Sequence, residues 1–113
     1  MPGRSILLAE PDPLVADTLQ CVLEVAGHKV ILAPDSTTAL RRLPGVDLLV
    51  TAWALPGCTA RELLLEAANR GVPSIVATGR VDDEPISFGQ TATLHKPFRL
   101  TKLLDAVRDV FGG

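Results

Sequence analysis

Short runs of apolar residues alternate along the chain with longer segments in which apolar residues recur every three or four positions. The short runs are rich in branched aliphatic side chains, which favour β-strands. The longer segments have the spacing of amphipathic α-helices. Strands are therefore predicted at residues 6–9, 29–33, 47–52, 74–77 and 91–95. A regular alternation of strand and helix is typical of an α/β domain.

The predicted helices carry start and stop signals. Asp12 is placed to cap the first helix, and Gly27 is suited to end it. Asp35 or Ser36 is suited to cap a short second helix, and Thr59 is expected to cap the third. The four helices are predicted at about residues 13–26, 36–43, 60–70 and 100–110.

The predicted strands are apolar along their whole length, which indicates that both faces of the sheet are covered. With right-handed crossovers this gives a doubly wound parallel sheet with helices on both sides. In such folds the working site lies at the carboxyl ends of the strands. Four residues fall there in this chain, namely Glu10, Ala52, Thr78 and Lys96.

Length and composition indicate one domain spanning residues 1–113, with 47% apolar residues for its core. The formal net charge of −2 gives no reason to expect direct binding to nucleic acid or an anionic membrane. No apolar run approaches the roughly 18–20 residues that span a bilayer, and no secretory signal is recognised, so a cytoplasmic location is expected. Cys21 and Cys58 are expected to be free thiols, and His28 and His95 to lie at the surface.

Four segments resemble the receiver domains of bacterial two-component response regulators. They are ILLAEPDPLV at 6–15, DLLVTAWALPG at 47–57, PSIVATG at 73–79 and HKPF at 95–98. They occur in the order of that family and cover essentially the whole chain. The resemblance implies a flavodoxin-like sheet in the order 2-1-3-4-5 and a cis peptide bond between Lys96 and Pro97.

The chain departs from the family pattern at the phosphorylation site. The resemblance places the phosphate-accepting aspartate at Ala52, whose methyl group cannot act as a nucleophile. The family's acidic pair reads Glu10-Pro11, so Glu10 is the one sure carboxylate for Mg²⁺, which prefers several oxygen ligands. We therefore expect a degenerate site at Glu10, Pro11, Ala52, Thr78 and Lys96, with no catalytic residue, no required cofactor and at most weak Mg²⁺ binding at Glu10.

Two further departures affect the expected output of the domain. The resemblance places a switch residue, usually aromatic, at Thr93. The segment between Thr78 and Lys96 is short, and Pro85 interrupts any helix that begins at Asp82. A shortened or irregular fourth helix is expected there.

Several residues have two interpretations. Glu10 is either an acid paired with Lys96 or a remnant metal ligand, and pairing is the favoured interpretation. Asp12 is favoured as a helix cap over a metal ligand. Trp53 is equally compatible with binding a partner at the mouth of the site and with packing on its own loop. Cys58 is favoured as an unreactive thiol.

The resulting hypothesis is a degenerate receiver that is not an enzyme and acts through phosphorylation-independent contact with another protein. A histidine kinase, an adaptor or an output domain would be such a partner, and a homodimer is also open. The alternative is an ordinary phospho-accepting receiver that carries an Asp-to-Ala change at position 52. A third hypothesis, small-ligand binding at the same strand ends, lacks the glycine-rich phosphate loop that nucleotide binding would need.

Overall fold

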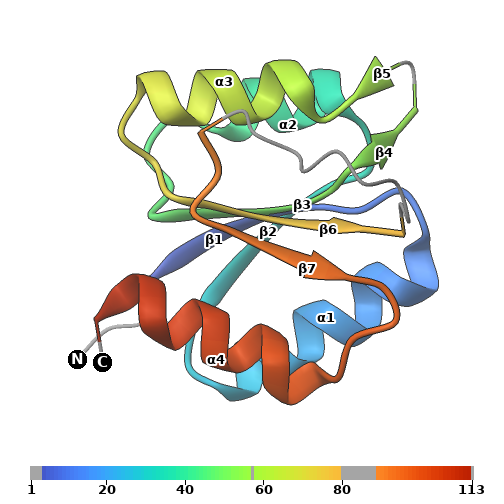
Figure 1. Cartoon of the computed structure of the whole chain (residues 1–113), viewed down its shortest axis with the longest axis vertical. Coiled ribbons are helices and arrows are strands. Elements are labelled where there is room, and N and C mark those ends of the chain that lie inside the picture. Colours follow the sequence, from blue (N-terminus) through green and yellow to red (C-terminus); the bar gives the residue numbers. More distant parts are fainter. Residues whose placement is uncertain (1–3, 57, 80–88, 113) are drawn as a thin grey trace.

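The computed structural model describes residues 4–56, 58–79 and 89–112, and these contain one five-stranded parallel sheet (Figure 1). The strands lie in the order β2-β1-β3-β6-β7. Their bounds are β1 Ser5–Ala9, β2 Lys29–Ala33, β3 Leu48–Ala52, β6 Ser74–Thr78 and β7 Ala92–His95. All four neighbouring pairs are parallel. Counted along the chain within this sheet, the order is 2-1-3-4-5, which confirms the predicted fold class.

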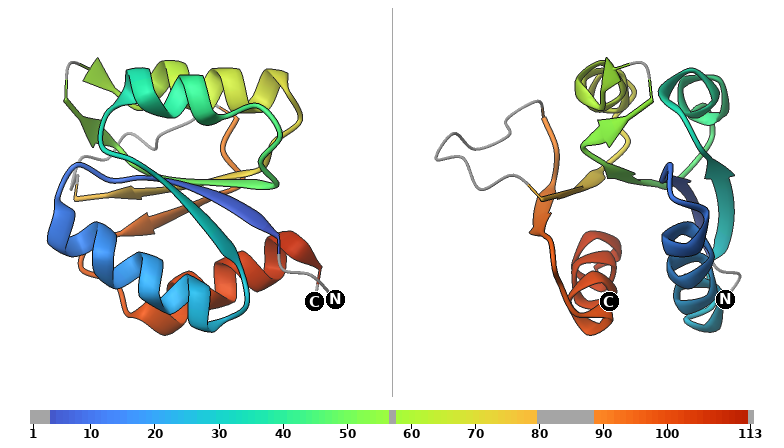
Figure 2. Two further views of the ribbon diagram at one scale, coloured as in Figure 1. Left: turned by 180° about the vertical axis from the view of Figure 1, so that it is seen from behind. Right: turned by 90° about the vertical axis from the view of Figure 1, so that its right-hand side faces the viewer.

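Helices cover both faces of the sheet in the described part of the chain. Their bounds are α1 Pro13–Val25, α2 Ser36–Arg42, α3 Arg61–Asn69 and α4 Leu100–Phe111. Figure 2 shows α2 and α3 on one face of the sheet and α1 and α4 on the other. Among these helices, none is both long enough and apolar enough to cross a membrane.

Each face of the sheet contributes to its own apolar cluster. Leu7 of β1 packs on the side of α2 and α3, whereas Ile6 and Leu8 pack on the side of α1 and α4. Successive side chains of a strand point to opposite faces, so a strand covered on both sides needs apolar residues at every position. This explains why the strands read as continuous apolar runs in the sequence.

The predicted caps of the first two helices are present, and the third prediction is wrong. Asp12 accepts hydrogen bonds from two backbone N–H groups in the first turn of α1, and Asp35 accepts one from the first turn of α2. Thr59 instead belongs to a short strand. Ala60 precedes the first residue of α3, and no side-chain cap bond is made there. The helix is held through its apolar face, whose residues Leu63 and Leu64 are fully buried.

A small antiparallel hairpin follows β3 and was not predicted as strands. It consists of β4, Ala54–Leu55, and β5, Cys58–Thr59. Two-residue strands are too short to produce a recognisable alternation of polar and apolar positions. The expected shortened fourth helix falls on residues 80–88, which lie outside the described residues.

His95 is exposed as expected, whereas His28 is only partly exposed. The ring of His28 is half-buried against Phe111, with 5.3 Å between ring centroids, and its Nδ1 atom is buried. The guanidinium of Arg4 lies 5.0 Å from the centre of the same Phe111 ring. The residue just before β2 therefore packs against the end of α4, a long-range contact that the local sequence pattern does not reveal.

Candidate functional site

A cavity of about 420 Å³ opens at the carboxyl end of the sheet. It lies where β1, β3 and β6, which are neighbours in the sheet, all end. All five positions predicted for the degenerate site contribute to it, and the full lining is Glu10, Pro11, Ala52, Trp53, Ala54, Ala77, Thr78, Gly79 and Lys96. The rule that parallel strands present their site at the carboxyl edge therefore holds for this chain.

Glu10 is the buried acid of this cavity, with 5% of its side chain exposed. One carboxylate oxygen, Oε1, lies 3.8 Å from the Nζ atom of Lys96. The other, Oε2, accepts a hydrogen bond of 3.0 Å from the backbone N–H of Asp12. Both oxygens are thus engaged within the chain, in agreement with the pairing interpretation.

Ala52 is the last residue of β3 and is buried. It pairs with Ala77 of β6 in the sheet register. Both side chains here are methyl groups, which offer neither a nucleophile nor a metal ligand.

Thr78 and Lys96 lie next to each other at the ends of β6 and β7. Thr78 is buried, and its backbone carbonyl accepts a hydrogen bond of 2.8 Å from the backbone N–H of Lys96. The peptide bond between Lys96 and Pro97 is cis, as the resemblance implied. The side chain of Lys96 is 41% exposed, so its ammonium group faces both the cavity and solvent.

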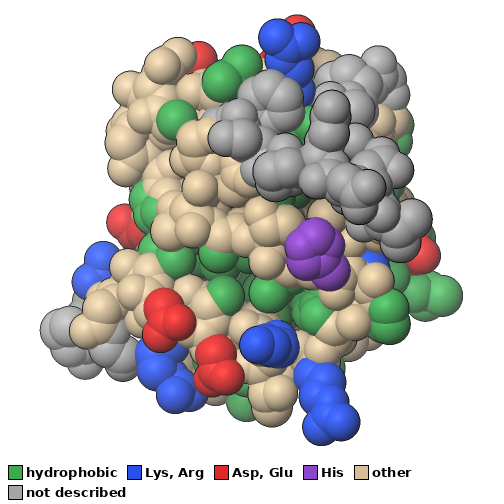
Figure 3. Space-filling model, viewed as in Figure 1, with side chains coloured by type: hydrophobic (Ala, Val, Ile, Leu, Met, Phe, Trp, Pro, Cys, Tyr) green, Lys and Arg blue, Asp and Glu red, His purple; other side chains and the backbone are tan. Residues whose placement is uncertain are grey.

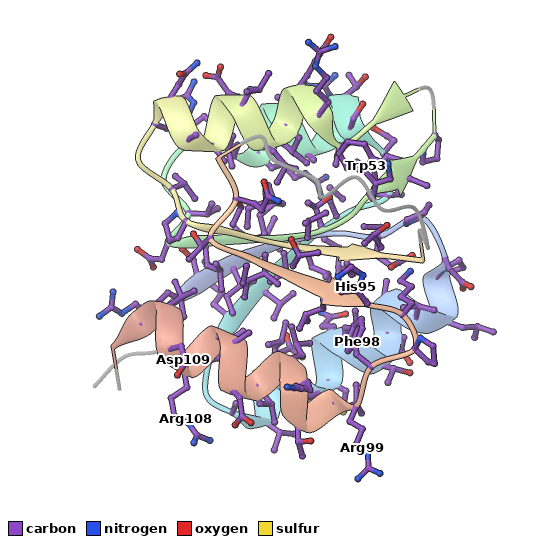
Figure 4. The ribbon with its side chains drawn as sticks, viewed as in Figure 1. Trp53, His95, Phe98, Arg99, Arg108 and Asp109 are labelled. Atoms are coloured by element: carbon purple, nitrogen blue, oxygen red, sulfur yellow. The ribbon has the colours of Figure 1, made fainter. Side chains whose placement is uncertain are left out.

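Trp53 lies between the apolar core and the cavity. Its side chain is half-buried and packs against the apolar cluster under α2 and α3, while the residue also lines the cavity. Its backbone N–H donates to the carbonyl of Ala77 at 2.8 Å, and its carbonyl accepts from the N–H of Ala60 at 2.8 Å. Figure 4 shows Trp53 and His95 at the same end of the sheet.

Two further acids, Asp12 and Asp47, take structural roles. Asp12 caps α1 and does not line the cavity. Asp47 lies just before β3, at the opposite end of the sheet, where its carboxylate accepts a 2.8 Å hydrogen bond from the backbone N–H of Ser5. Within the described residues no group of three or more histidine, cysteine, aspartate or glutamate side chains is placed to hold a metal ion.

Thr93, the predicted switch position, lies within β7 and does not line the cavity. It is half-buried, and its hydroxyl accepts a 3.3 Å hydrogen bond from the side-chain amide of Gln90. A threonine side chain is much shorter than the aromatic side chain that the resemblance places at this position.

Sequence reasoning missed an apolar groove of about 590 Å³ next to the cavity. It lies between α1 and the segment that joins β7 to α4, and Lys96 lines both hollows. Its lining includes Leu14, which is 79% exposed. The available signal was the position of Leu14 on the polar side of the predicted first helix.

Comparison with known proteins supports the resemblance that the motifs suggested. No protein-family model matches the chain. The chain is 31% identical over 117 residues to the sensor histidine kinase AruS of Pseudomonas aeruginosa, covering 93% of this chain and 12% of that protein. It is 30% identical over 112 residues to the transcriptional regulatory protein FixJ of Bradyrhizobium diazoefficiens, covering 89% of this chain and 55% of that protein. The chain thus spans only about a tenth to a half of these two proteins.

Solved receiver domains share the fold over nearly their whole length. The signal receiver domain of an HD domain-containing protein from Pseudomonas fluorescens aligns with a TM-score of 0.88 and 28% identity, covering 97% of this chain and 95% of that one. The receiver domain of a sensor histidine kinase from Pseudomonas aeruginosa aligns with a TM-score of 0.87 and 24% identity, covering 98% and 99%. That structure is described with a magnesium ion in its active-site cleft.

The fold, the order of the motifs and these relatives together support a receiver-type response-regulator domain.

Proposed function

We propose that this receiver domain signals through phosphorylation-independent contact with a protein partner. The observation that carries the proposal is Ala52, a buried methyl group at the end of β3, inside the cavity formed by the strand ends. Phosphoryl transfer to a protein needs an oxygen, nitrogen or sulfur nucleophile, and this position has none.

The rest of the cavity also argues against the chemistry of a phospho-accepting receiver. Mg²⁺ needs near-octahedral coordination by oxygen atoms. Glu10 already uses one oxygen for Lys96 and the other for the N–H of Asp12, and Pro11 and Ala52 carry no ligand. These residues do not fit a magnesium site, so we propose that Mg²⁺ binds weakly or not at all.

In this proposal the cavity at the strand ends needs no bound ligand. The ion pair between Glu10 and Lys96 satisfies the buried carboxylate without a bound metal or phosphate. Thr93 has no ring to reorient, so the domain would present one surface at all times and would not alternate between two. Suitable partners are the proteins with which receiver domains work, namely a histidine kinase, an adaptor or an output domain.

Treatment with a phosphodonor tests the proposal. The protein is incubated with acetyl phosphate and Mg²⁺, and its intact mass is measured alongside a receiver domain that keeps its aspartate as a positive control. We expect the control to gain one phosphoryl group and this chain to gain none. Hydroxylamine-sensitive phosphate on Glu10, Asp12 or Asp47 would refute the proposal.

The alternative function, an ordinary receiver with an altered residue at position 52, makes a different prediction. It requires an aspartate codon at position 52 of the native gene, whereas the degenerate receiver requires an alanine codon. Reading that codon separates the two.

A further inference from the structure

Helix α1 exposes an apolar stripe to solvent, on the side opposite the one that packs on the sheet. Leu14 and Val25 are 79% and 84% exposed, and Thr18 and Cys21 between them are also exposed. Residues spaced four, three and four apart lie along one side of a helix. The buried side of α1 is formed by Ala16, Leu19 and Leu23, so this helix has two apolar faces and only one of them is covered by its own chain.

One flank of the exposed stripe is acidic. A shallow hollow of about 310 Å³ lies beside Cys21 and Val25 and is lined by Asp17, Gln20 and Glu24. Both acids are exposed, and the side chain of Gln20 donates a long 3.4 Å hydrogen bond to the carboxylate of Glu24.

The other flank faces α4 and carries positive charge. Near the start of α1, Leu14 shares the apolar groove with Lys96 and Leu100. In the view of Figure 3, apolar side chains reach the surface between β7 and α4. Near the end of α1, Ala26 shares a hollow of about 280 Å³ with Arg108.

These shared hollows show that α1 and α4 run side by side in the same direction. The first residues of α1 lie next to the first residues of α4, and the last residues of α1 lie next to the last residues of α4. Figure 2 agrees, with the two helices next to each other below the sheet. Arg108 is exposed and lies 3.9 Å from Asp105 on its own helix, a weak contact that another acid can replace. Figure 4 shows Arg108 pointing away from the sheet.

The surface is complementary to a second copy of itself in one orientation. A two-fold axis parallel to α1 keeps the two α1 helices parallel and sets the acidic flank of each copy opposite the α4 side of the other. Glu24 then faces Arg108 of the second copy, and Asp17 faces the end that carries Lys96. A two-fold axis perpendicular to α1 would make the helices antiparallel and bring the two acidic flanks together, which like charges disfavour.

We propose that the α1–α4 face is a homodimer interface in which the two α1 stripes pack against each other in parallel. The contact is isologous, and because the two-fold axis runs parallel to the helices, each stripe residue meets the same residue of the second copy. Burial of Leu14 and Val25 supplies the apolar contact, and the opposed flanks set the orientation. The proposal goes beyond the proposed function, because it requires no particular chemistry at Ala52.

A lipid surface fits the α1–α4 face less well than a second copy of the chain does. Asp17 and Glu24 would be repelled by anionic headgroups.

Sedimentation of the purified chain over a wide concentration range tests the interface directly. We expect a reversible dimer whose dissociation constant rises about tenfold or more in Leu14→Lys and in Val25→Lys. Leu65→Lys is the matched control, because Leu65 is also an exposed apolar residue but lies on α3, across the sheet. A chain that stays monomeric at every concentration overturns the proposal, and so does a Leu65→Lys variant that dissociates equally.

A charge exchange tests the orientation without altering the apolar stripe. Glu24→Lys and Arg108→Glu should each weaken the dimer, and the double variant should recover most of the loss. Both positions are exposed, so the variants should fold, which thermal unfolding verifies. Losses that simply add in the double variant would show that these two residues do not face each other.

Thiol cross-linking distinguishes parallel from antiparallel packing. In a Cys21→Ser, Cys58→Ser background, a short bismaleimide should link two copies of Val25→Cys to each other. Antiparallel packing would instead link Val25→Cys copies only to Leu14→Cys copies in a mixture, and that result overturns the proposed geometry.

Discussion

The Nζ atom of Lys96 lies 3.8 Å from Oε1 of Glu10, although the strands that carry these two residues are not neighbours. Glu10 follows β1, Lys96 follows β7, and the ends of β3 and β6 lie between them. The ion pair therefore reaches across the cavity in which Ala52 and Thr78 are found. The same lysine cannot be fully committed to Glu10 and to a phosphoryl group on β3 at the same time.

Removing both partners of this ion pair should cost less stability than the two single removals added together. Lys96→Met leaves Glu10 buried with one hydrogen bond, and we expect a loss of about 1 kcal/mol in the free energy of unfolding, because the exposed half of Lys96 is screened by water. Glu10→Gln with Lys96→Met should lose less than the sum of the single changes. Urea unfolding at low protein concentration measures both, and strictly additive losses would show that the pair contributes nothing.

Gly89 should not tolerate a side chain. Its φ of +84° favours glycine, and a Cβ atom there would lie 2.8 Å from the Cβ of Ala68 on α3. Gly89→Ala should therefore lower the free energy of unfolding by about 2 kcal/mol through backbone strain and overpacking together. Gly45→Ala is the matched control, since its φ is +87° but no atom lies within 4 Å of the added carbon. Equal losses in the two variants would contradict a steric role for Gly89.

Asp35 should give the fold a pH-dependent contribution to stability. The pKa of its carboxyl group is lowered below the ordinary 3.8, first by the backbone hydrogen bond from Thr38, then by the Thr38 side chain, with smaller help from Arg41 and Arg42. A lowered pKa in the folded state stabilises the protein above the unfolded value, and this stabilisation is lost as the pH falls through the folded value.

The difference in unfolding free energy between the unsubstituted chain and Asp35→Asn should therefore shrink on acidification below about pH 4. Asparagine still accepts the capping hydrogen bond, so this variant removes the charge alone. Asp35→Ala should remain destabilised at all pH values, because it has no acceptor. A difference for Asp35→Asn that does not change with pH would contradict the assigned cause.

The architecture was predictable because the apolar pattern of the strands and the capping residues of the helices indicate the same fold. Strands covered on both faces must be apolar throughout, so β1 and β3 were recognisable from sequence alone. Asp12 and Asp35 identified the starts of α1 and α2, because their carboxylates bind N–H groups that follow closely in the chain. The members of the cavity were predictable for the same reason, since parallel strands end together at one edge.

The features that were missed depend on contacts between distant parts of the chain. His28 is half-buried because Phe111 of the last helix packs on it, and the residues next to His28 in the sequence give no sign of that contact. The start of α3 was misassigned to Thr59, since this helix begins without a side-chain cap and takes its place from packing. The exposed side of α1 was also overlooked, although Leu14 and Val25 fall outside the apolar stripe predicted for this helix, because single exposed apolar residues are common on protein surfaces.

Restoring the missing carboxylates should recover the metal site only when two positions are changed together. Pro11 and Ala52 both line the cavity that holds Glu10. Ala52→Asp alone adds one carboxylate, which Lys96 would attract, so Mg²⁺ should still bind weakly. Ala52→Asp combined with Pro11→Asp should raise the Mg²⁺ affinity about tenfold or more over either single change. Fluorescence of Trp53, the sole tryptophan and a residue of the cavity, provides the titration signal, and Ala52→Asn with Pro11→Asn is the matched control without new charge.

Even with both carboxylates restored, phosphorylation should not operate a switch. The introduced aspartate beside Lys96 should accept a phosphoryl group slowly from acetyl phosphate, because a nucleophile and a cation are then both present. The output should not follow, since Thr93 is small and held by Gln90, and has no ring that can move between two positions. We expect less than about a tenfold donor-dependent change, or about 1.4 kcal/mol of coupling, in dimer or partner affinity, measured with and without donor. A larger change would mean that the readout is intact and that the carboxylates were its only missing parts, which would favour the ordinary receiver over the degenerate one.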